Sequence, residues 1–324
     1  MWTSKNKKLC AVSLALMLGL TMISKQEKDT PGDNHLSSGA SIVRGNMVKI
    51  DNYANVSKYI NNRTFSFLDR IEILQDEEEY PQGLCFTEDY VLISSYSGIR
   101  NELGKIKIYD RTTGEYLISL GMDEDSHLGG LTFDGKYIWV CNSSKMAIER
   151  LPYALIQQMV RDNKGQIIDI RNLVDMYHVN NIPSCITYYD GQLWIATHSI
   201  WTNAIMIGYH YDEIENRLYS LSSFWIPSKV QGVTFSEKGE VYLSTSYGRK
   251  NDSYIKKYES VYVMSKDVHD YIEKIKLPPC AEEIVYKDKK LYVLFESAGK
   301  KYLEGTDGKG KSIAPINKIL IIEE

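Results

Sequence analysis

The chain has 324 residues, of which 43% are hydrophobic and 25% are charged, a balance typical of a globular protein with a substantial core. The formal net charge is −4 and no basic stripe runs along the chain, which argues against nucleic acid as a partner. Tyrosine is abundant, with 24 residues against 7 phenylalanines, which suits many half-buried strands because the ring packs while the hydroxyl stays in water.

The chain begins with a predicted targeting segment, residues 1–23. Lys5, Lys7 and Lys8 precede an apolar run from Leu9 to Ile23, which is short for a membrane helix and has the length of a signal-peptide core. Because no good small-x-small cleavage site follows, an uncleaved N-terminal membrane anchor is the alternative. In both cases we expect the rest of the chain to be secreted or held at the outer face of the cytoplasmic membrane.

Residues 24–63 are predicted to form a linker and arm. Positions 25–46 are polar and include Pro31-Gly32, as in a flexible linker. Residues 47–62 have a weak periodicity that suits a short helix or an ordered arm. Residues 64–74 then alternate between apolar and polar side chains at the period of a strand, with no hairpin partner of their own.

A two-strand unit recurs five times from residue 82 onward. The fourth copy, residues 229–249, is a predicted β-hairpin with a turn at 236–239. The first strands of the five copies open with Gln82-Gly83, Gly129-Gly130, Ser184-Cys185, Gln231-Gly232 and Glu282-Glu283. The second residues of these pairs lie 47, 55, 47 and 51 positions apart. A period of roughly 40 to 50 residues with several strands per unit is typical of a β-propeller.

Two outer strands are expected after each of the first four hairpins. The expected pairs are 105–109 with 115–120, 146–151 with 167–170, 204–211 with 217–225, and 254–264 with 271–276. A short helix over 154–161 explains the longest spacing. The sequence therefore predicts an all-β fold, a five-bladed β-propeller of four-stranded antiparallel blades.

The fifth hairpin is followed by only one strand, residues 317–322. We expect the N-terminal strand, residues 64–74, to pair with it and close the ring, because an unpaired blade edge costs stability. The propeller domain is thus predicted to span residues 64–324. We expect it to be a monomer, with the membrane approached only through the N-terminal segment.

The repeat also predicts where polar side chains converge. In propellers the innermost strand begins, and the second strand ends, at the same face of the central channel, where concave sites form. The candidate ligand-binding residues at these positions are Gln82, His127, His198, Gln231, Tyr247, Arg249 and Glu283. Glu296 and Glu282 are the candidate catalytic residues, because carboxylates that approach one another repel, and one then has a raised pKa suited to a general acid or base.

Two other interpretations of this cluster remain open. Its groups could satisfy one another and ordered water in a narrow channel, with Arg249, Lys300 or Lys301 forming static salt bridges to the glutamates. The carboxylate, amide and hydroxyl oxygens would also suit calcium. No acid-rich calcium loop and no other metal motif is present, so no metal ligand is assigned and the cofactor is unknown.

Four cysteines follow the leader: Cys85, Cys141, Cys185 and Cys280. An even number in an exported chain permits two disulfides. However, three of the four fall inside strand patterns of different blades. We therefore expect small buried side chains without bridges.

Two segments resemble the propeller-type glutamine cyclotransferases, which convert N-terminal glutamine into pyroglutamate. Gln231-Gly232 followed by Tyr247-Gly248-Arg249 resembles the first hairpin of a blade in that family, and Phe295-Glu296-Ser297 resembles its Phe-Glu-Ser segment. The resemblance implies that Glu296 is a proton carrier. In that family the three motifs share one blade, whereas here they are divided between blades four and five.

Three classes of function follow from these observations. The first is an exported module that recognises a small polar ligand, a glycan or a peptide at the mouth of the channel. The second is an enzyme of the cyclotransferase or hydrolase type that uses Glu296 or Glu282 as its acid or base. The third is an interaction scaffold whose channel is filled by its own side chains. The fold alone does not decide among them, and the recognition module is the preferred hypothesis.

Overall fold

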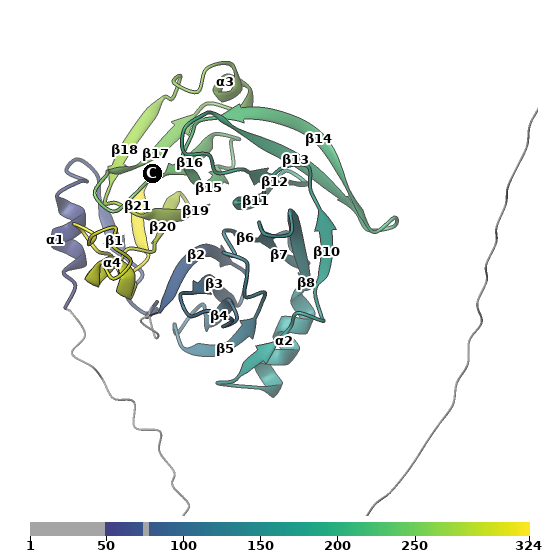
Figure 1. Cartoon of the computed structure of the whole chain (residues 1–324). Coiled ribbons are helices and arrows are strands. Elements are labelled where there is room, and N and C mark those ends of the chain that lie inside the picture. Colours follow the sequence, from purple (N-terminus) through teal and green to yellow (C-terminus); the bar gives the residue numbers. More distant parts are fainter. Residues whose placement is uncertain (1–48, 74–77) are drawn as a thin grey trace, which may run out of the picture. The chain divides into compact units, whose positions relative to one another are not determined.

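The computed structural model describes residues 49–73 and 78–324, which form a five-bladed β-propeller (Figure 1). The inner strands of the blades are β2 (Glu79–Phe86), β6 (Leu131–Phe133), β11 (Cys185–Tyr189), β15 (Val230–Phe235) and β19 (Ala281–Lys287). Each inner strand contacts the inner strands of both neighbouring blades, and β2 meets β6 on one side and β19 on the other. The inner strands therefore form an unbroken ring around a central channel.

Three further antiparallel strands complete each blade. The second strands are β3 (Tyr90–Ser97), β7 (Tyr137–Asn142), β12 (Gln192–Ala196), β16 (Val241–Thr245) and β20 (Lys290–Phe295). The third strands are β4 (Lys105–Asp110), β8 (Ala147–Pro152), β13 (Ala204–Asp212), β17 (Ser253–Tyr258) and β21 (Leu320–Glu323). The outer strands are β5 (Tyr116–Gly121), β10 (Asp175–His178), β14 (Arg217–Ile226), β18 (Glu273–Leu277) and β1 (Phe65–Phe67). The predicted fold class is confirmed.

Burial explains the sequence pattern of the blades. Inner and second strands are covered on both faces by neighbouring blades, and residues 91–95 of β3 are all buried. The outer strand β14 is instead mostly exposed, with only Ile226 fully buried. Between blades one and two, Ile106 and Ile118 pack in one cluster with Ile138 and Leu151. Near-continuous apolar runs therefore mark the inner part of each blade.

An N-terminal arm leads into the propeller. Its helix α1 (Asn52–Ser57) is capped by the side chain of Asp51 and docks on blade five, where Val56 is buried and the Asn55 amide donates to the Pro315 carbonyl at 2.9 Å. This helix falls within the predicted arm. The predicted leader, residues 1–23, and the linker to residue 46 lie outside the described residues. Within the described ranges, no helix is long and apolar enough to cross a membrane.

The strand predicted over 64–74 is shorter in the structure. β1 pairs antiparallel with β21, with Phe65 opposite Ile322 and Phe67 opposite Leu320. The chain then turns out of the sheet, and Leu68, Ile71 and Ile73 are buried in a core cluster with blade one. Residues 65–67 of the segment therefore form an edge strand, and the residues after them contribute apolar side chains to the core. How much this pairing stabilises the ring stays a prediction.

One outer strand was assigned to the wrong blade. Residues 167–170 were expected to complete blade two, but β9 (Ile167–Asp169) pairs in parallel with β5 of blade one. Helix α2 (Tyr153–Asp162) carries the chain across to that blade, and Ile168 packs on its core cluster. The outer strand of blade two is β10, which pairs with β8 and was not anticipated.

Two short helices also depart from the prediction. Residues 254–264 were expected to be one strand, but β17 ends at Tyr258 and helix α3 (Val261–Lys266) follows. The Ser260 side chain accepts the Val263 N–H, so a helix cap outweighs the strand propensity of this valine- and tyrosine-rich segment. After β20, helix α4 (Lys300–Glu304) ends at Gly305, whose φ of 72° terminates the helix.

Candidate functional site

The candidate site begins with β-bulges in three inner strands. The pairing register shifts between Pro81 and Gly83, between Val230 and Gly232, and between Ala281 and Ile284. The residues skipped by these shifts are Gln82, Gln231, Glu282 and Glu283. Because a bulge re-aims the side chain of the extra residue, the same irregularity in blades one, four and five directs polar side chains away from the regular strand faces.

Two glutamates of blade five line a cavity at the mouth of the central channel, which we call the mouth pocket. Glu282, on β19, hydrogen-bonds Glu296, which follows β20. The Gln231 side-chain amide donates to Glu282 Oε1 at 3.1 Å, and the Gln82 amide donates to Glu296 Oε2 at 3.0 Å. Blades four and one therefore hold the two carboxyls of blade five between them, as the repeat positions predicted.

The surroundings of this carboxyl pair favour a proton shared between the two groups. Burial, together with repulsion from Glu296, keeps the pKa of Glu282 well above its usual range. Burial also raises the pKa of Glu296, while hydrogen bonds from the Tyr302 hydroxyl and Glu282 and the charge of Lys301 act in the opposite direction. Glu282 is therefore the proton donor of the pair and Glu296 the acceptor, an arrangement expected when two carboxyls share one site.

Beside Glu296, three tyrosines surround the ammonium group of Lys301. Its Nζ lies 4.0 Å from the ring centre of Tyr80, 4.7 Å from that of Tyr96 and 4.9 Å from that of Tyr302, and it also bonds the Tyr96 hydroxyl. Burial lowers the pKa of this lysine, although Glu296 opposes that effect. Lys301 is thus a partly desolvated cation held by aromatic faces next to the carboxyl pair.

Arg249 pairs with an aspartate and not with the glutamates. Its Nη1 donates to Asp307 Oδ1 at 2.8 Å and to the Lys301 and Gly310 carbonyls at 2.8 and 2.6 Å. Its guanidinium also lies 4.3 Å from the ring centre of Tyr302. The alternative in which Arg249 forms a static salt bridge to the glutamates is therefore wrong. Arg249 instead fastens the loop after α4 to the rim of the site.

These groups surround a cavity of about 410 Å³, the mouth pocket. The residues that line it are His198, Gln231, Ser246, Tyr247, Gly248, Arg249, Cys280, Glu282, Glu296, Lys301, Tyr302, Asp307 and Lys309. Six of the nine predicted site residues are among them. Gln82 reaches the pocket only through its bond to Glu296, and His127 packs beside it on Tyr96, with ring centres 4.6 Å apart.

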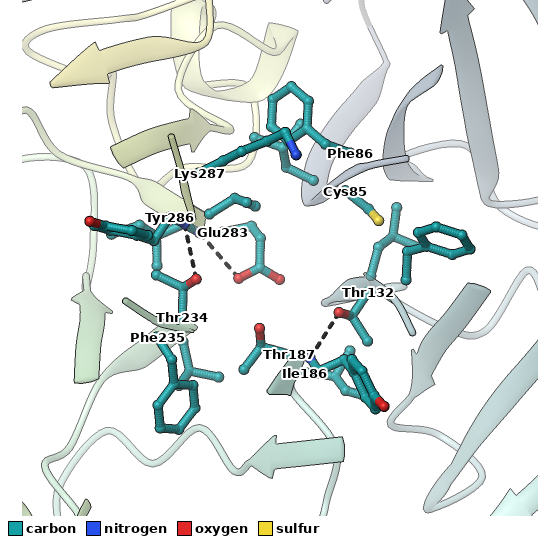
Figure 2. A pocket seen from close by; sticks show the side chains of 17 residues that line it. Cys85, Phe86, Thr132, Ile186, Thr187, Thr234, Phe235, Glu283, Tyr286 and Lys287 are labelled. Carbon is teal, nitrogen blue, oxygen red and sulfur yellow. Dashed lines mark hydrogen bonds between the residues drawn. The ribbon is translucent and has the colours of Figure 1, made fainter. Parts of the chain in front are cut away.

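Glu283 lies in the channel and not in the mouth pocket, so its predicted place is corrected. Figure 2 shows its carboxyl at the centre of the channel, with Thr132, Thr187 and Thr234 around it. The Ile284 N–H donates to Oε1 at 3.1 Å. Burial raises the pKa of Glu283 well above its usual range, while the backbone amides of Ile284, Val233 and Leu131 lower it.

Small residues make room for this carboxyl. A Cβ on Gly232 would stand 2.7 Å from Glu283 Oε1, and one on Gly130 would stand 3.1 Å from Oε2. Both glycines occupy the same repeat position as Glu283. One blade therefore supplies a long acidic side chain where two others supply none, and the channel beyond it is a cavity of about 170 Å³.

Four residues of the site were not singled out from the sequence: Tyr80, Cys280, Asp307 and Lys309. Asp307 and Lys309 lie in a loop with positive φ at Gly305, Gly308 and Gly310. That glycine spacing indicates a compact loop, but nothing in it predicts that the loop folds over the mouth. The four cysteines after the leader are free and buried, as expected. No group of three histidine, cysteine or carboxylate side chains that could hold a metal occurs in the described ranges.

Comparison with known proteins gives limited similarity. The sequence matches no protein-family model and none of the curated proteins. Among solved structures it is similar to the glutaminyl cyclase of Myxococcus xanthus, with 8% identity, a TM-score of 0.43, and 81% of this chain and 98% of that chain covered. It is also similar to the PQQ-bound aldose sugar dehydrogenase of Streptomyces coelicolor, with 13% identity, a TM-score of 0.47, and 82% and 99% covered.

Proposed function

We propose that this propeller recognises a small polar ligand, a glycan or a peptide in the mouth pocket. The observation that carries the proposal is the hydrogen-bonded pair of Glu282 and Glu296, which lines a cavity of about 410 Å³. Carboxyls that serve only structure are normally neutralised by salt bridges. Here Arg249, which lines the pocket, pairs with Asp307, and the acceptor Glu296 is only partly buried.

The pocket is chemically suited to hydroxyl and amine groups. Glu282 and Gln231 place a carboxyl and an amide side by side, and Glu296 adds a second acceptor. Lys309 is exposed on the rim and His198 is half-buried there. A ligand with several hydroxyl or N–H donors would satisfy acceptors that are otherwise left to water.

A second candidate function is general acid and base catalysis in the same pocket. It is favoured by the unequal surroundings of the pair, since the pKa of Glu282 is raised by burial and by Glu296, whereas Glu296 accepts hydrogen bonds from three side chains that lower its pKa. Two carboxyls whose environments separate their pKa values can serve as acid and base in one reaction. The Phe295-Glu296-Ser297 resemblance points to the same residue as the proton carrier.

We also infer that the protein acts outside the cytoplasm, as a monomer. The support is the charged and apolar pattern of residues 1–23. Fractionation of cells expressing the full chain, with and without residues 1–23, tests export. Recovery of both forms in the cytoplasm contradicts it. Light scattering on the purified chain tests the monomer, and a mass of twice 37.1 kDa contradicts it.

The recognition proposal is tested by a thermal-shift screen of the full chain against monosaccharides, amino acids and short peptides. Compounds that raise the melting temperature are then titrated by calorimetry into the wild type and the Glu296→Gln variant. We expect binding to fall at least tenfold in Glu296→Gln, about 1.4 kcal/mol. The exposed Glu259→Gln is the matched control. Equal affinity of all three proteins contradicts the proposal.

The two candidate functions differ in what happens to the bound compound. Incubating each compound with the protein and analysing the products by mass spectrometry detects turnover. Glu282→Gln keeps a hydrogen-bond donor beside Glu296 but cannot release a proton. Binding without turnover in the wild type supports recognition, whereas turnover that is lost in Glu282→Gln supports catalysis.

A further inference from the structure

Two tryptophans of blade three are unusually exposed. Trp201 is 85% exposed and Trp225 is 55% exposed, whereas Trp139 and Trp194 in the same fold are 0% and 6% exposed. A large ring left in water is informative because burying such a side chain is strongly favourable. These two rings therefore need a physical account that the core does not supply.

Trp201 adjoins the mouth pocket. It lies in the loop between β12 and β13, and its ring centre is 6.4 Å from that of Tyr247, at an interplanar angle of 58°. Tyr247 lines the mouth pocket, and the Lys229 ammonium lies 5.3 Å from its ring centre. An aromatic surface thus continues outward from the carboxyl pair along blades three and four.

Trp225 lies further along the same side of blade three. It is opposite Ile205 in the β13–β14 pairing. Ile205 lies only four residues after Trp201 in the sequence. A chain of four residues spans at most about 14 Å, and paired strands lie about 5 Å apart. Trp225 also lines a second cavity of about 600 Å³, together with Thr202, Asn203, Ser265, Asp267 and His269. The loop that carries Trp201 therefore also contributes Thr202 and Asn203 to this outer cavity.

Building on the proposed function, we propose that the ligand is a carbohydrate chain. One sugar occupies the mouth pocket, and the following sugars stack on Trp201 and Trp225. A sugar ring has C–H groups on its faces and hydroxyls around its edge, so it matches an aromatic plane that is flanked by polar side chains. Hydroxyl, amide, carboxylate and imidazole groups flank Trp225. The mouth pocket supplies the carboxyl and amide groups that bind vicinal hydroxyls.

An extended peptide fits the same surface less well. A peptide that adds to a sheet edge needs free backbone groups on that edge and pockets for alternate side chains. At Trp225 the backbone N–H of the edge strand β14 is already donated to Ser265 Oγ at 3.0 Å. Six of the eight residues that line the outer cavity have polar or charged side chains, and the other two are Trp225 and Val268. Carbohydrate is therefore the favoured class.

The test is a titration of the full chain, with its tryptophans labelled with ¹⁵N, against chito-, xylo-, arabino- and galacturono-oligosaccharides of one to six units. We expect the indole N–H signals of Trp201 and Trp225 to shift with one series. Affinity should rise with length, and Trp201→Ala and Trp225→Ala should each remove about tenfold of the affinity for the longer members while sparing the single sugar. Ile214→Ala, at a side chain that is 96% exposed between β13 and β14, is the control.

The outcomes separate this inference from the proposed function. No binding by any series, or equal affinities of the wild type, Trp201→Ala and Trp225→Ala, overturns the carbohydrate tract. Shifts of both indoles with a proline-rich peptide and not with sugars also overturn it. If Trp201→Ala weakens oligosaccharide binding and Glu296→Gln does not, the tryptophan tract stands and the mouth-pocket function falls. Loss in both variants supports both proposals.

Discussion

Glu282 and Glu283 are consecutive residues of one strand with opposite surroundings. The bulge in β19 places Glu282 in the mouth pocket, against a second carboxyl and an amide. Glu283 stands alone in the channel, where backbone N–H groups face it and Oε2 accepts no side-chain hydrogen bond in the described structure. Burial raises the pKa of both glutamates.

The difference shows how one irregularity separates a reactive region from a structural one. In the mouth pocket the carboxyls face a cavity of about 410 Å³ and each other. In the channel the carboxyl fills space that Gly232 and Gly130 leave open. The mouth pair can exchange its proton with a ligand, whereas Glu283 is fixed by inner strands from several blades. Four measurements would sharpen or break this comparison.

The largest effect is expected from Gly232→Ala. The new Cβ would lie 2.7 Å from Glu283 Oε1 and 2.7 Å from the backbone N of Ile284. Because the backbone of an inner strand has no room to retreat, we expect a loss of about 3 kcal/mol in unfolding free energy. Urea denaturation measures it. Both sites should be disturbed, since the same backbone carries them.

Gly208→Ala is the matched control for that change. Its Cβ would come as close to neighbouring atoms, but these are the side-chain oxygens of Gln192 and Ser222, at 2.7 and 2.9 Å. Both side chains can rotate away, so we expect a loss below about 1 kcal/mol. Similar losses at the two glycines would show that the channel ring is not the rigid part of the fold.

The second effect is a fall in stability with rising pH, which is smaller within one pH unit than the loss expected for Gly232→Ala. Glu282 titrates near 4.5 when unfolded and well above that when folded. Between these values the folded protein holds a proton that the unfolded chain has lost. Unfolding free energy therefore decreases as pH rises, by about 1.4 kcal/mol per pH unit for each such group. Glu283 acts in the same direction. Replacing either glutamate with glutamine should remove that residue's contribution to the decrease of unfolding free energy with pH.

Denaturation curves from pH 5 to pH 8 measure these slopes. Glu259→Gln, at an exposed carboxyl, should leave the wild-type slope unchanged. If Glu283→Gln alone removes the entire slope, the mouth pair does not share a proton and the contrast between the two glutamates fails. If Glu282→Gln removes its share without lowering stability at pH 5, the proton-holding role of Glu282 is supported.

A smaller effect of opposite sign is expected at Asp307. Its pKa is lowered, first by the hydrogen bond to Arg249, so its contribution is present above 3.8 and is lost as pH falls through the folded pKa. Because Asp307 is exposed, Asp307→Asn should cost only about 1 kcal/mol at pH 7. The cost should shrink at pH 3, whereas the exposed Asp270→Asn should cost little at either pH. A cost for Asp307→Asn that grows with acidity contradicts the pairing.

Much of the fold was predictable because an apolar two-strand hairpin recurs five times at a similar spacing. The exceptions were decided by packing and capping. Residues 167–169 pair with blade one because α2 carries them there, and no local pattern distinguishes an outer strand of one blade from that of the next. Ser260 begins a helix inside an apparent strand, since a single capping side chain outweighs average propensity.

The site was predictable in position but not in detail. Glu282 and Glu296 meet because they occupy converging repeat positions in one blade. The channel location of Glu283 depends on the bulge, which shifts the face of a single residue and has no signature beyond the Glu-Glu pair. The Asp307 partner of Arg249 comes from a loop outside the repeat, so repeat alignment could not reveal it.

The smallest perturbation uses the thiols as probes of the two cavities. Cys280 lines the mouth pocket and Cys85 lines the channel. Burial raises the pKa of both thiols. Near Cys280, the charges of Glu296 and Glu282 raise it further and those of Arg249 and Lys301 lower it, whereas near Cys85 Glu283 raises it and Lys287 lowers it. The mouth pocket, at about 410 Å³, offers a reagent more room than the channel cavity, at about 170 Å³. Iodoacetamide at pH 8, which reacts with the thiolate, should therefore modify Cys280 first, then Cys85, as located by peptide mass spectrometry. Cys280→Ser should remove only the first label. Earlier modification of Cys85 would mean that the channel, and not the mouth pocket, is the more accessible side of the bulge.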